Sequence, residues 1–416
     1  MKNTLVYIFT LLFLCSTLRL AAQDEALYDR LEQKGYEIVN IENTGVRAFL
    51  DDRSYDDPSR TGDYSFSVVR RYSSGVPSRP AGLQLNWESD TPASQIAKIV
   101  VTLLEADRML KEAAIDSPLY RDSLRFYYPS VDKREYLLSN MCPRKYCYYK
   151  VEEIRKDGSQ EMLKSGKFYT EGRVRMLRVE GMVNVRDFGG WTSSYGGRTR
   201  FGRLFRGNRP DGVTATGKND FVKNEHLTAD LDLRGQDLGK SPFGSPVEYY
   251  VTNNSRYKPA LAGSSSSEVL ARDLRIIAQV LGRGGSVFMH CEHGVNRCGT
   301  LSFLIDGLMG LSEADLSRTY ELSAFAYGTQ RGSTYGAMIP YIRSFGEDGD
   351  DLAKCFYNYA LHIGVSEETL DTILTEMLGP SYGQGTKSAS PDYVHDVPEA
   401  MPTEETPNTS VLDLDF

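Results

Sequence analysis

The sequence predicts a two-domain protein, in which an all-β sandwich precedes an α/β domain with a central, largely parallel sheet flanked by helices. Three observations support this fold class. The chain of 416 residues is longer than one ordinary core of about 100–200 residues requires. Short strand-like segments follow one another from about residue 45 to 172. Beyond residue 177, buried strands alternate with amphipathic helices, which is typical of layered α/β folds. We expect the sandwich at 24–172 and the α/β domain at 173–379.

The N-terminus has the pattern of a secretory signal peptide over residues 1–22. Lys2 gives a positive start, Leu5 to Leu14 form an apolar run, and two alanines precede Gln23. A membrane anchor is the alternative, but the run is short for a span and Arg19 interrupts its end. We therefore expect a periplasmic or secreted protein with no transmembrane span once the signal is removed.

Strand signals define the first domain. "LQLNWES" alternates apolar and polar residues, "AKIVVTLLEAD" is rich in β-branched residues, and "KYCYYKVEEIRKDG" and "KSGKFYTEG" flank a glycine turn. With Trp87 in an early strand and this ending, the segment resembles a fibronectin type III or immunoglobulin-like module. Its tyrosines allow two interpretations, a face that binds a protein or a glycan partner, or half-buried sandwich residues, and we favour the second. They are Tyr127, Tyr128, Tyr146, Tyr148 and Tyr149.

Helix signals define the second domain. The segment 265–282 opens with a capping box at Ser265 and Glu268, carries apolar residues at helical spacing, and stops at Gly282. "SVFMH" predicts a buried strand, and "GTLSFLIDGLMG", "SEADLSRTYELSAF" and "SEETLDTILTEML" predict helices. The segment 380–416 is rich in Pro, Ser, Thr and acidic residues, which predicts a disordered tail.

Composition excludes several classes of function. The formal charge of −8 becomes −10 without the signal peptide, so no basic surface for nucleic acid is expected. The five histidines show no paired ligand spacing, and neither a metal nor another cofactor is expected. Five cysteines remain after processing, and Cys142 and Cys147 are either a disulfide across a turn or two buried thiols.

The stretch "VFMHCEHGVNRCGT" contains the candidate catalytic and anion-binding residues. A buried strand ends at His290, Cys291 follows, and a helix begins near Cys298. The turn from Glu292 to Arg297 therefore lies at a helix N-terminus, where backbone N–H groups and the helix dipole attract an anion. The same field lowers the pKa of a thiol, so Cys291 is a candidate nucleophile toward a bound phosphate.

The form "HC-x-x-G-x-x-R" resembles the phosphate-binding loop of cysteine-dependent phosphatases. "NVRDFGG", "GRLFRG", "LDLRG" and "YELS" occur in the order of the bacterial tyrosine-phosphatase family. The resemblance runs from about 177 to 379 and implies an α/β phosphatase fold with activity on phosphotyrosine, other phosphoproteins or phosphoinositides. It makes Cys291 the nucleophile and Arg297 the anion-binding arginine, with the rest of the loop as substrate contacts: Glu292, His293, Gly294, Val295, Asn296 and Cys298.

The loop departs from the usual "HC-x-x-G-K-D-R-T-G" at three positions. Val295 stands for the lysine, which weakens the case for multiply phosphorylated lipids. Asn296 stands for the aspartate and cannot donate a proton to a leaving group. Cys298 stands for the threonine and is a weaker hydrogen-bond donor to the nucleophile. We also consider a disulfide between Cys298 and Cys291, with a small packing residue as the favoured alternative.

Several acids outside the loop are candidates for function. The general acid is sought among Asp232, Asp211 and Asp237, and Asp232 at a strand end is preferred. Its alternative is a structural salt bridge with Arg234. Arg186 and Asp187 either brace the loop close to the ligand or pair with each other, and we count Asp187 among the substrate-binding residues.

The sequence therefore predicts a cysteine-dependent phosphatase acting through a phosphocysteine intermediate, without a cofactor. Its expected substrates are phosphate monoesters such as phosphotyrosine. The "HCE" start with Glu292 resembles secreted inositol-polyphosphate (phytate) hydrolases and keeps inositol phosphates as an alternative. A phosphate-binding protein without turnover is the third interpretation, because the usual acid and hydroxyl are missing.

Overall fold

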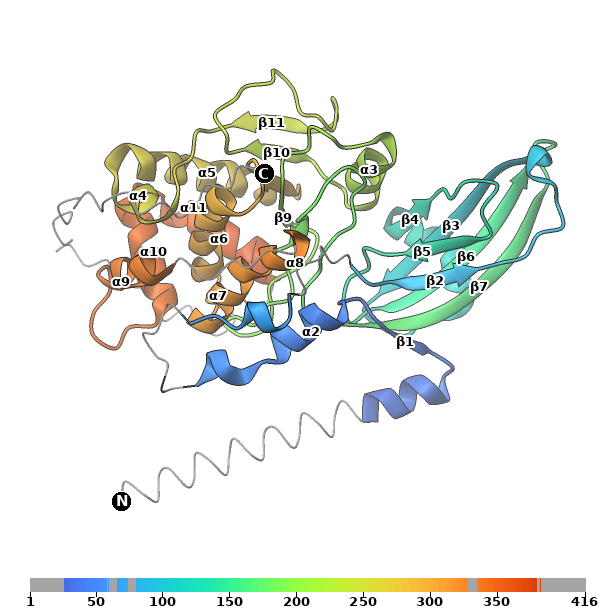
Figure 1. Cartoon of the computed structure of the whole chain (residues 1–416), viewed down its shortest axis with the longest axis horizontal. Helices are drawn as coiled ribbons and strands as arrows, with labels where there is room; N and C mark the ends of the chain where they lie inside the picture. Colours follow the sequence, from blue (N-terminus) through green and yellow to red (C-terminus); the bar gives the residue numbers. More distant parts are fainter. Residues whose placement is uncertain are drawn as a thin grey trace.

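The computed structural model describes residues 26–57, 59, 66–73, 80–327, 335–379 and 382. The expected signal peptide and nearly all of the predicted tail lie outside these residues. Figure 1 shows a rounded α/β body joined to an elongated β body. Within the described part of the chain, we find no helix with the length and hydropathy needed to cross a bilayer.

The β body consists of two sheets that share one core. Ile99, Val151 and Phe168 of the larger sheet pack against Leu85 and Trp87 of the smaller one. The predicted strands over 83–89, 97–107, 145–158 and 164–172 are thus present; the assignment to a fibronectin or immunoglobulin type stays a prediction. The larger sheet has the order β1 (Glu37–Asn40), β7 (Gln160–Glu171), β6 (Tyr146–Arg155), β3 (Ile96–Ala106) and β4 (Leu124–Tyr127), and β2 (Leu83–Asn86) pairs with β5 (Glu135–Leu138). Short 3₁₀ turns are η4 (Ala93–Gln95), η5 (Glu112–Asp116) and η6 (Pro118–Ser123).

Most of the tyrosines in this body are structural. Tyr127, Tyr148 and Tyr149 are buried, whereas Tyr128 is exposed. The hydroxyls of Tyr148 and Tyr36 contact each other inside a second small cluster. Tyr146 is half-buried and packs against the rings of Tyr36 and Tyr169, so the favoured interpretation as packing residues holds for four of the five.

The segment before β2 packs on the α/β body rather than in the sandwich. Asn43 caps the helix α2 (Thr44–Asp51) by accepting a hydrogen bond from the N–H of Val46. The helix buries Val46 and Phe49 in the α/β core, where the Phe49 ring contacts Phe325. Two 3₁₀ turns, η1 (Arg53–Asp56) and η3 (Val69–Arg71), follow. The predicted strands from residue 45 and the boundary of the sandwich at 24–172 are thus wrong here, because the apolar residues recur at helical spacing.

The α/β sheet is parallel except at one edge. β11, β10, β12 and β9 pair in parallel, and β8 joins β9 antiparallel. Neighbouring residues of β12 face opposite sides, so Met289 enters the main core while Phe288 enters a smaller one. The predicted largely parallel sheet is confirmed. Its strands are β8 (Arg186–Asp187), β9 (Leu204–Gly207), β10 (Ala229–Asp232), β11 (Glu248–Val251) and β12 (Val287–His290).

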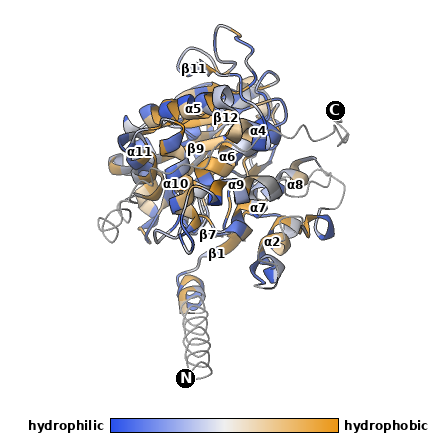
Figure 2. Ribbon diagram, turned by 90° about the vertical axis from the view of Figure 1, so that its left-hand side faces the viewer, coloured by the Kyte–Doolittle hydropathy of each residue, from blue (hydrophilic) through white to orange (hydrophobic). Residues whose placement is uncertain are grey.

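Long helices cover mainly one face of this sheet. Apolar residues of α5 and α6 fill the main core, and Figure 2 shows hydrophobic residues concentrated on β9 and α6 in the interior. The other face is covered by residues 177–185, a π-helical turn η7 (Asp220–Asn224) and residues 243–247. The helices are α3 (Ala215–Asn219), α4 (Tyr257–Ala262), α5 (Ser264–Gly282), α6 (Asn296–Leu308), α7 (Glu313–Glu321), α8 (Ser323–Tyr327), α9 (Met338–Arg343), α10 (Leu352–His362) and α11 (Glu367–Leu378), with a 3₁₀ turn η8 (Tyr335–Ala337).

Two of the three expected helix caps occur. The hydroxyls of Ser312 and Ser366 accept hydrogen bonds at the starts of α7 and α11. The capping box at Ser265 and Glu268 is wrong, because the N-cap of α5 is Gly263, two residues before Ser265, and no side chain caps the helix.

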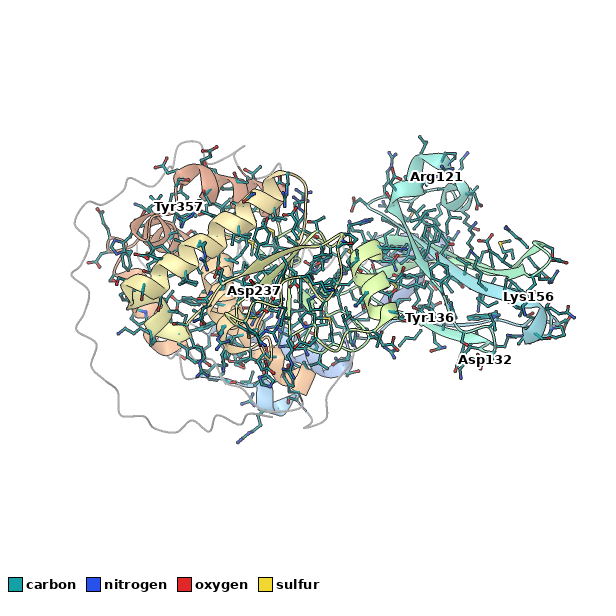
Figure 3. All side chains as sticks on the ribbon, turned by 90° about the horizontal axis from the view of Figure 1, so that it is seen from above. Arg121, Asp132, Tyr136, Lys156, Asp237 and Tyr357 are labelled. Carbon is teal, nitrogen blue, oxygen red and sulfur yellow. The ribbon has the colours of Figure 1, made fainter. Side chains whose placement is uncertain are left out.

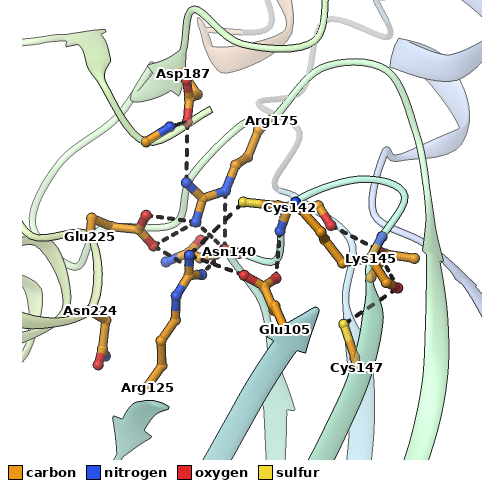
Figure 4. A network of polar contacts seen from close by, with 12 residues as sticks. Glu105, Arg125, Asn140, Cys142, Lys145, Cys147, Arg175, Asp187, Asn224 and Glu225 are labelled. Atoms are coloured by element: carbon orange, nitrogen blue, oxygen red, sulfur yellow. Dashed lines mark hydrogen bonds and ion pairs between the residues drawn. The ribbon is translucent and has the colours of Figure 1, made fainter. Parts of the chain in front are cut away.

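A buried network of charges joins the two bodies (Figure 4). The fully buried guanidinium of Arg175 lies 3.2 Å from Asp187 and 2.7 Å from Glu225, and it also donates to the carbonyl of Asn140 in the β body. Arg125 of β4 lies 3.5 Å from the same Glu225. Water cannot replace a lost partner of charges buried in this way, so breaking the network is costly. The network therefore holds the two bodies in one relative orientation.

Asn224 of η7 closes the edge of the β sheet. Its amide oxygen accepts from the Phe126 N–H at 3.0 Å, and its amide nitrogen donates to the Phe126 carbonyl at 3.0 Å. These are the two bonds that a further strand would make on the edge strand β4.

Replacing Asn224 by alanine should lower the free energy of unfolding by about 1–3 kcal/mol, because both backbone groups of Phe126 lose their partners at the junction. The measurement is the urea midpoint followed by intrinsic fluorescence. The exposed Asn86→Ala on β2 is the control and should stay within about 0.5 kcal/mol of the parent. Equal midpoints for both variants would contradict the bridging role of Asn224.

Candidate active site

The chemistry-bearing loop connects β12 to α6. β12 ends at His290, the loop runs from Cys291 to Val295, and α6 begins at Asn296. Gly294 has φ +69°, and a Cβ at this position would lie 2.4 Å from the backbone of Gly207. Only glycine permits both the left-handed turn and this contact with β9.

Side chains from three other elements hold the carbonyl groups of this loop. Asn184 donates to the His293 carbonyl at 3.0 Å and to the Gly294 carbonyl at 3.3 Å. The Tyr327 hydroxyl donates to the His293 carbonyl at 2.6 Å, and Arg206 donates to the Gly294 carbonyl at 2.9 Å. The loop carbonyls are therefore occupied by protein donors.

The N–H groups of the loop divide into two sets. Those of His293 and Gly294 bond to the sulfur of Cys291, as does the N–H of Cys298. Those of Glu292, Val295, Asn296 and Arg297 have no acceptor among the described residues, and no side chain caps α6. Free N–H groups at the start of a helix of 13 residues form an anion-binding concavity.

The two loop cysteines form a donor–acceptor pair. A hydrogen bond from the thiol of Cys298, assisted by the backbone N–H groups, holds the pKa of Cys291 well below its usual range even though burial opposes it. Burial and this same bond raise the pKa of Cys298. These shifts favour the thiolate at Cys291 and the thiol at Cys298, which occupies the position of the threonine in the usual loop. The Cys298 thiol also lies 3.9 Å from the carbonyl oxygens of Gly207 and Met289, which accept from it.

Replacing Cys298 by alanine should raise the pKa of Cys291 by about one, since a hydrogen bond to a charged group is lost. Cys298→Thr keeps a donor and should leave the pKa as low as in the parent or lower it. The pH dependence of iodoacetamide alkylation of Cys291 measures both values. If the alanine variant titrates like the parent, Cys298 is a packing residue only.

All five cysteines of the described chain are free thiols: Cys142, Cys147, Cys291, Cys298 and Cys355. The alternative of buried thiols is therefore the one found for Cys142 and Cys147. No bond links Cys298 to Cys291 in this structure. Within the described residues, no group of His, Cys, Asp or Glu has the arrangement of a metal site.

The remaining loop residues lie at the mouth of the site. Arg297, in the first turn of α6, is partly exposed and has no ion pair or hydrogen bond with the described residues. Glu292 is exposed and pairs with Arg209 at 3.0 Å. The Asn296 side chain accepts a hydrogen bond from Tyr257 at 2.7 Å, while Val295 is buried.

Asp232 is a buried anion and not a proton donor. Arg234 holds both of its oxygens at 2.8–3.1 Å, and Tyr249 donates to it at 3.1 Å. Burial acts to raise the pKa of Asp232, but the hydrogen bonds from Arg234 outweigh it and lower the pKa. These contacts favour the alternative of a salt bridge over the preferred role as general acid, because a carboxylate stabilised by an arginine is a poor proton donor, and the role as general acid stays a prediction.

The other two candidate acids differ in position. Asp211 lies 3.1 Å from Arg234 and 3.7 Å from Arg209, which itself contacts Glu292 of the loop. Asp237 caps the N–H of Gly239 in an exposed loop on the α/β body (Figure 3). Asp211 is thus the candidate that the ion pairs connect to the catalytic loop. We call Arg209, Asp211, Arg234 and Glu292 the charged rim.

Asp187 faces away from the loop. Adjacent residues of a strand point to opposite faces, so Arg186 turns toward the loop and Asp187 toward the junction. Asp187 accepts from the N–H groups of Gly189 and Gly202 and pairs with Arg175; burial raises its pKa to about 6, which leaves it ionised at neutral pH. Its expected contact with substrate is wrong, because its side chain is fully buried in other contacts. The bracing role falls to Arg186, which holds Asn184 and Ser323.

The sequence predicts no contact with the loop for three residues that hold it. Asn184 and Arg206 belong to the motif blocks but have no predicted role, and Tyr327 belongs to no motif. The signal for the first two was present, since both belong to the motif blocks before the loop. Nothing in the sequence relates Tyr327 to the loop, because that contact depends on the position of α8.

The family comparison matches the part of the chain that contains the α/β body. Residues 177–383 match the sequence profile described as the tyrosine phosphatase family. The solved core catalytic domain of the PP-IP phosphatase SIW14 from S. cerevisiae, in complex with citrate, is 19% identical, with a TM-score of 0.26. The alignment covers 35% of this chain and 86% of that one. No curated protein matches the chain significantly. Residues 177–383 are therefore similar to the tyrosine phosphatase family, and the loop that carries Cys291 lies inside the matched segment.

Proposed function

We propose that the chain is an exported, protein-tyrosine-phosphatase-like enzyme that hydrolyses phosphate monoesters with phenolic leaving groups. The observation that carries this proposal is the thiolate of Cys291 at the base of a loop with four unpaired N–H groups. Such a loop binds the oxygens of a phosphate and places its phosphorus next to the sulfur. Arg297, which has no ion pair with the described residues, supplies a guanidinium for the same oxygens.

The first step transfers the phosphoryl group to sulfur. The thiolate of Cys291 attacks phosphorus, the S–P bond forms, and the P–O bond to the leaving group breaks with its electrons moving to that oxygen. The loop N–H groups and Arg297 stabilise the charge on the three remaining oxygens. In the second step, water attacks phosphorus, the S–P bond breaks, and phosphate leaves.

Cys298 supports the second step. Its thiol donates to the sulfur of Cys291 and stabilises the thiolate that must be expelled from the phosphocysteine. The loss of the usual threonine hydroxyl was the main reason to consider a protein without turnover. Because a donor is retained at this position, we favour turnover over phosphate binding alone.

The charged rim favours substrates whose leaving group needs no proton from a general acid. Asp211 and Asp232 share Arg234, and Glu292 is held by Arg209, so each of these carboxyl groups is paired with an arginine. A carboxylate stabilised by an arginine is a poor proton donor. Phenolic oxygens leave more readily than alcohols, which supports phosphotyrosine over phosphoserine.

The same rim argues against inositol polyphosphates. Two arginines, Arg209 and Arg234, are matched by the carboxylates of Asp211, Asp232 and Glu292, so the charged rim adds no unpaired cation to that of Arg297. Val295 adds no cation to the loop. Several phosphates on one ring need several unpaired cations, so we rank this substrate class second.

The deciding experiment measures the phosphate released from a phosphotyrosine peptide, a phosphoserine peptide of the same sequence, an aryl phosphate and inositol hexakisphosphate. We expect the aryl phosphate and phosphotyrosine to react at least about 10²-fold faster than phosphoserine, the factor that a missing general acid costs. Faster hydrolysis of inositol hexakisphosphate would move the substrate to the alternative class. Oxyanion binding without any release would leave a phosphate-binding protein.

Export rests on the sequence over residues 1–22. If the proposal is correct, the protein recovered from the periplasm or medium begins at or near Gln23. N-terminal sequencing of that protein tests it, and a mature chain that still carries Lys2 would contradict it. A protein or glycan partner for the β body also stays a proposal, with Tyr128 as its exposed aromatic residue.

A further inference from the structure

Two buried arginines lie beneath the catalytic loop, on the side of its carbonyl groups. Arg186 of β8 and Arg206 of β9 are directly opposite each other in the antiparallel pair, and each is less than 5% exposed. Burial and the charge of Arg206 lower the pKa of Arg186 from its ordinary value. Two like charges placed together in a core are costly and call for a functional explanation.

Arg206 is the one of the pair that touches the loop carbonyls. Its Nη2 donates to the Gly294 carbonyl at 2.9 Å and lies 3.4 Å from the Val295 carbonyl. Its Nε and Nη1 have no hydrogen-bond acceptor among the described residues. The guanidinium is therefore held to the loop on one edge and open on the other.

Arg206 also lines a small cavity of about 10 Å³, whose walls combine charged and apolar side chains. This volume is about that of one water molecule. Asp306 of α6 also lines the cavity, and burial raises its pKa to about 7. The charge of Arg186 and Arg206 is thus only partly balanced by one carboxyl group. The lining residues are Val174, Arg186, Asp187, Phe188, Trp191, Arg206, Asp306, Thr319 and Leu322.

A guanidinium on a carbonyl affects the N–H of the same peptide unit. The carbonyls of Gly294 and Val295 belong to the units whose N–H groups are those of Val295 and Asn296. These two N–H groups are among the four that have no acceptor in the described chain. Hydrogen bonds along a chain polarise one another, so a charge on the carbonyl makes the N–H a stronger donor to an anion.

We propose that Arg206 is a positioning residue that fixes the peptide units of Gly294–Asn296 and strengthens their N–H groups toward the bound phosphate. The usual loop has a lysine where this loop has Val295. Arg206 supplies a positive charge from beneath the loop in place of that lysine. Arg186 supports the same units indirectly through Asn184. The inference rests on the proposed phosphate-binding function of the loop, and it assigns no contact between Arg206 and substrate.

The test compares Arg206→Gln with a matched arginine. Arg203, three residues earlier, also holds backbone carbonyls, those of Leu281 and Gly284, but at a turn away from the loop. We measure tungstate binding by calorimetry, the alkylation rate of Cys291 against pH, and Tm. Arg206→Gln should weaken tungstate binding about tenfold or more, as expected when a charged donor is removed, and should raise the pKa of Cys291. Arg203→Gln should change Tm alone.

A conservative variant separates positioning from folding. Arg206→Lys keeps the charge but not the fork of donors, and it should recover part of the tungstate affinity lost in Arg206→Gln. Parent-like tungstate binding in Arg206→Gln, or an equal loss in Arg203→Gln, would overturn the inference. A parent that binds tungstate but releases no phosphate would instead refute the proposed turnover and leave the role of Arg206 intact. A parent that does not bind tungstate contradicts both.

Discussion

Replacing Cys291 by serine should reduce the turnover of an aryl phosphate by at least about 10³-fold, because the attacking thiolate is lost. A serine hydroxyl at this position stays protonated at neutral pH, and no side chain of the described site acts as a base for it. Cys291 is already ionised, since Cys298 and three backbone N–H groups stabilise its negative charge. The measurement is kcat with p-nitrophenyl phosphate near neutral pH.

The same variant should still bind an oxyanion. The N–H groups of Glu292, Val295, Asn296 and Arg297 and the guanidinium remain in place, and a neutral hydroxyl no longer repels the anion. We expect tungstate affinity equal to or higher than that of the parent. Cys355→Ser is the matched control, because Cys355 is buried in α10 and burial raises its pKa. A Cys291→Ser enzyme as fast as the parent, or an equal loss in Cys355→Ser, would end the thiolate mechanism.

Replacing Arg175 by methionine should lower the free energy of unfolding by about 3–5 kcal/mol, the cost of leaving buried charges without a partner. Asp187 would lose its only arginine partner among the described residues, while Glu225 and the carbonyl of Asn140 would keep only Arg125. No water replaces these contacts, because the Arg175 side chain and both carboxyl groups are almost fully buried. Urea unfolding followed by fluorescence and circular dichroism measures the loss.

The position of Arg175 between the two bodies makes the shape of the transition informative. We expect the parent to unfold in one transition and Arg175→Met in two, because the variant uncouples the β body from the phosphatase domain. Arg283→Met is the control, since Arg283 forms a half-exposed pair with Glu248 that contributes at most about 1 kcal/mol. A loss in Arg175→Met no larger than in this control would contradict the role of the junction.

Local sequence was sufficient for the features that depend on neighbours along the chain. The strand before Cys291, the glycine turn and the start of α6 follow from apolar runs, a φ that only glycine adopts easily, and helical spacing. The order of the motif blocks added the family, which the match over residues 177–383 supports. The largely parallel sheet followed from the alternation of strands and helices.

Predictions failed where a residue has two physically reasonable partners and only distance decides between them. The position of Asp232 at a strand end predicted a general acid, but in the structure Arg234 donates to both of its carboxylate oxygens. The position of Asp187 before two glycines predicted a contact with the ligand, but the alternation of side chains along β8 directs it toward Arg175. The strand-like interpretation from about residue 45 placed Phe49 in the sandwich, although the segment forms α2 and the Phe49 ring contacts Phe325 of α8.

The sequence by itself predicted the nucleophile, the anion-binding loop and the α/β class of the second domain, because each depends on residues that are close together in the chain. Only the tertiary structure decided that Cys298 supports the low pKa of Cys291, that Arg206 and Asn184 hold the loop carbonyls, and that Arg175 connects the two bodies. These contacts join segments far apart in the sequence or depend on side-chain direction. Their energies arise from burial and from distances of a few ångströms, which exist only once the chain has folded.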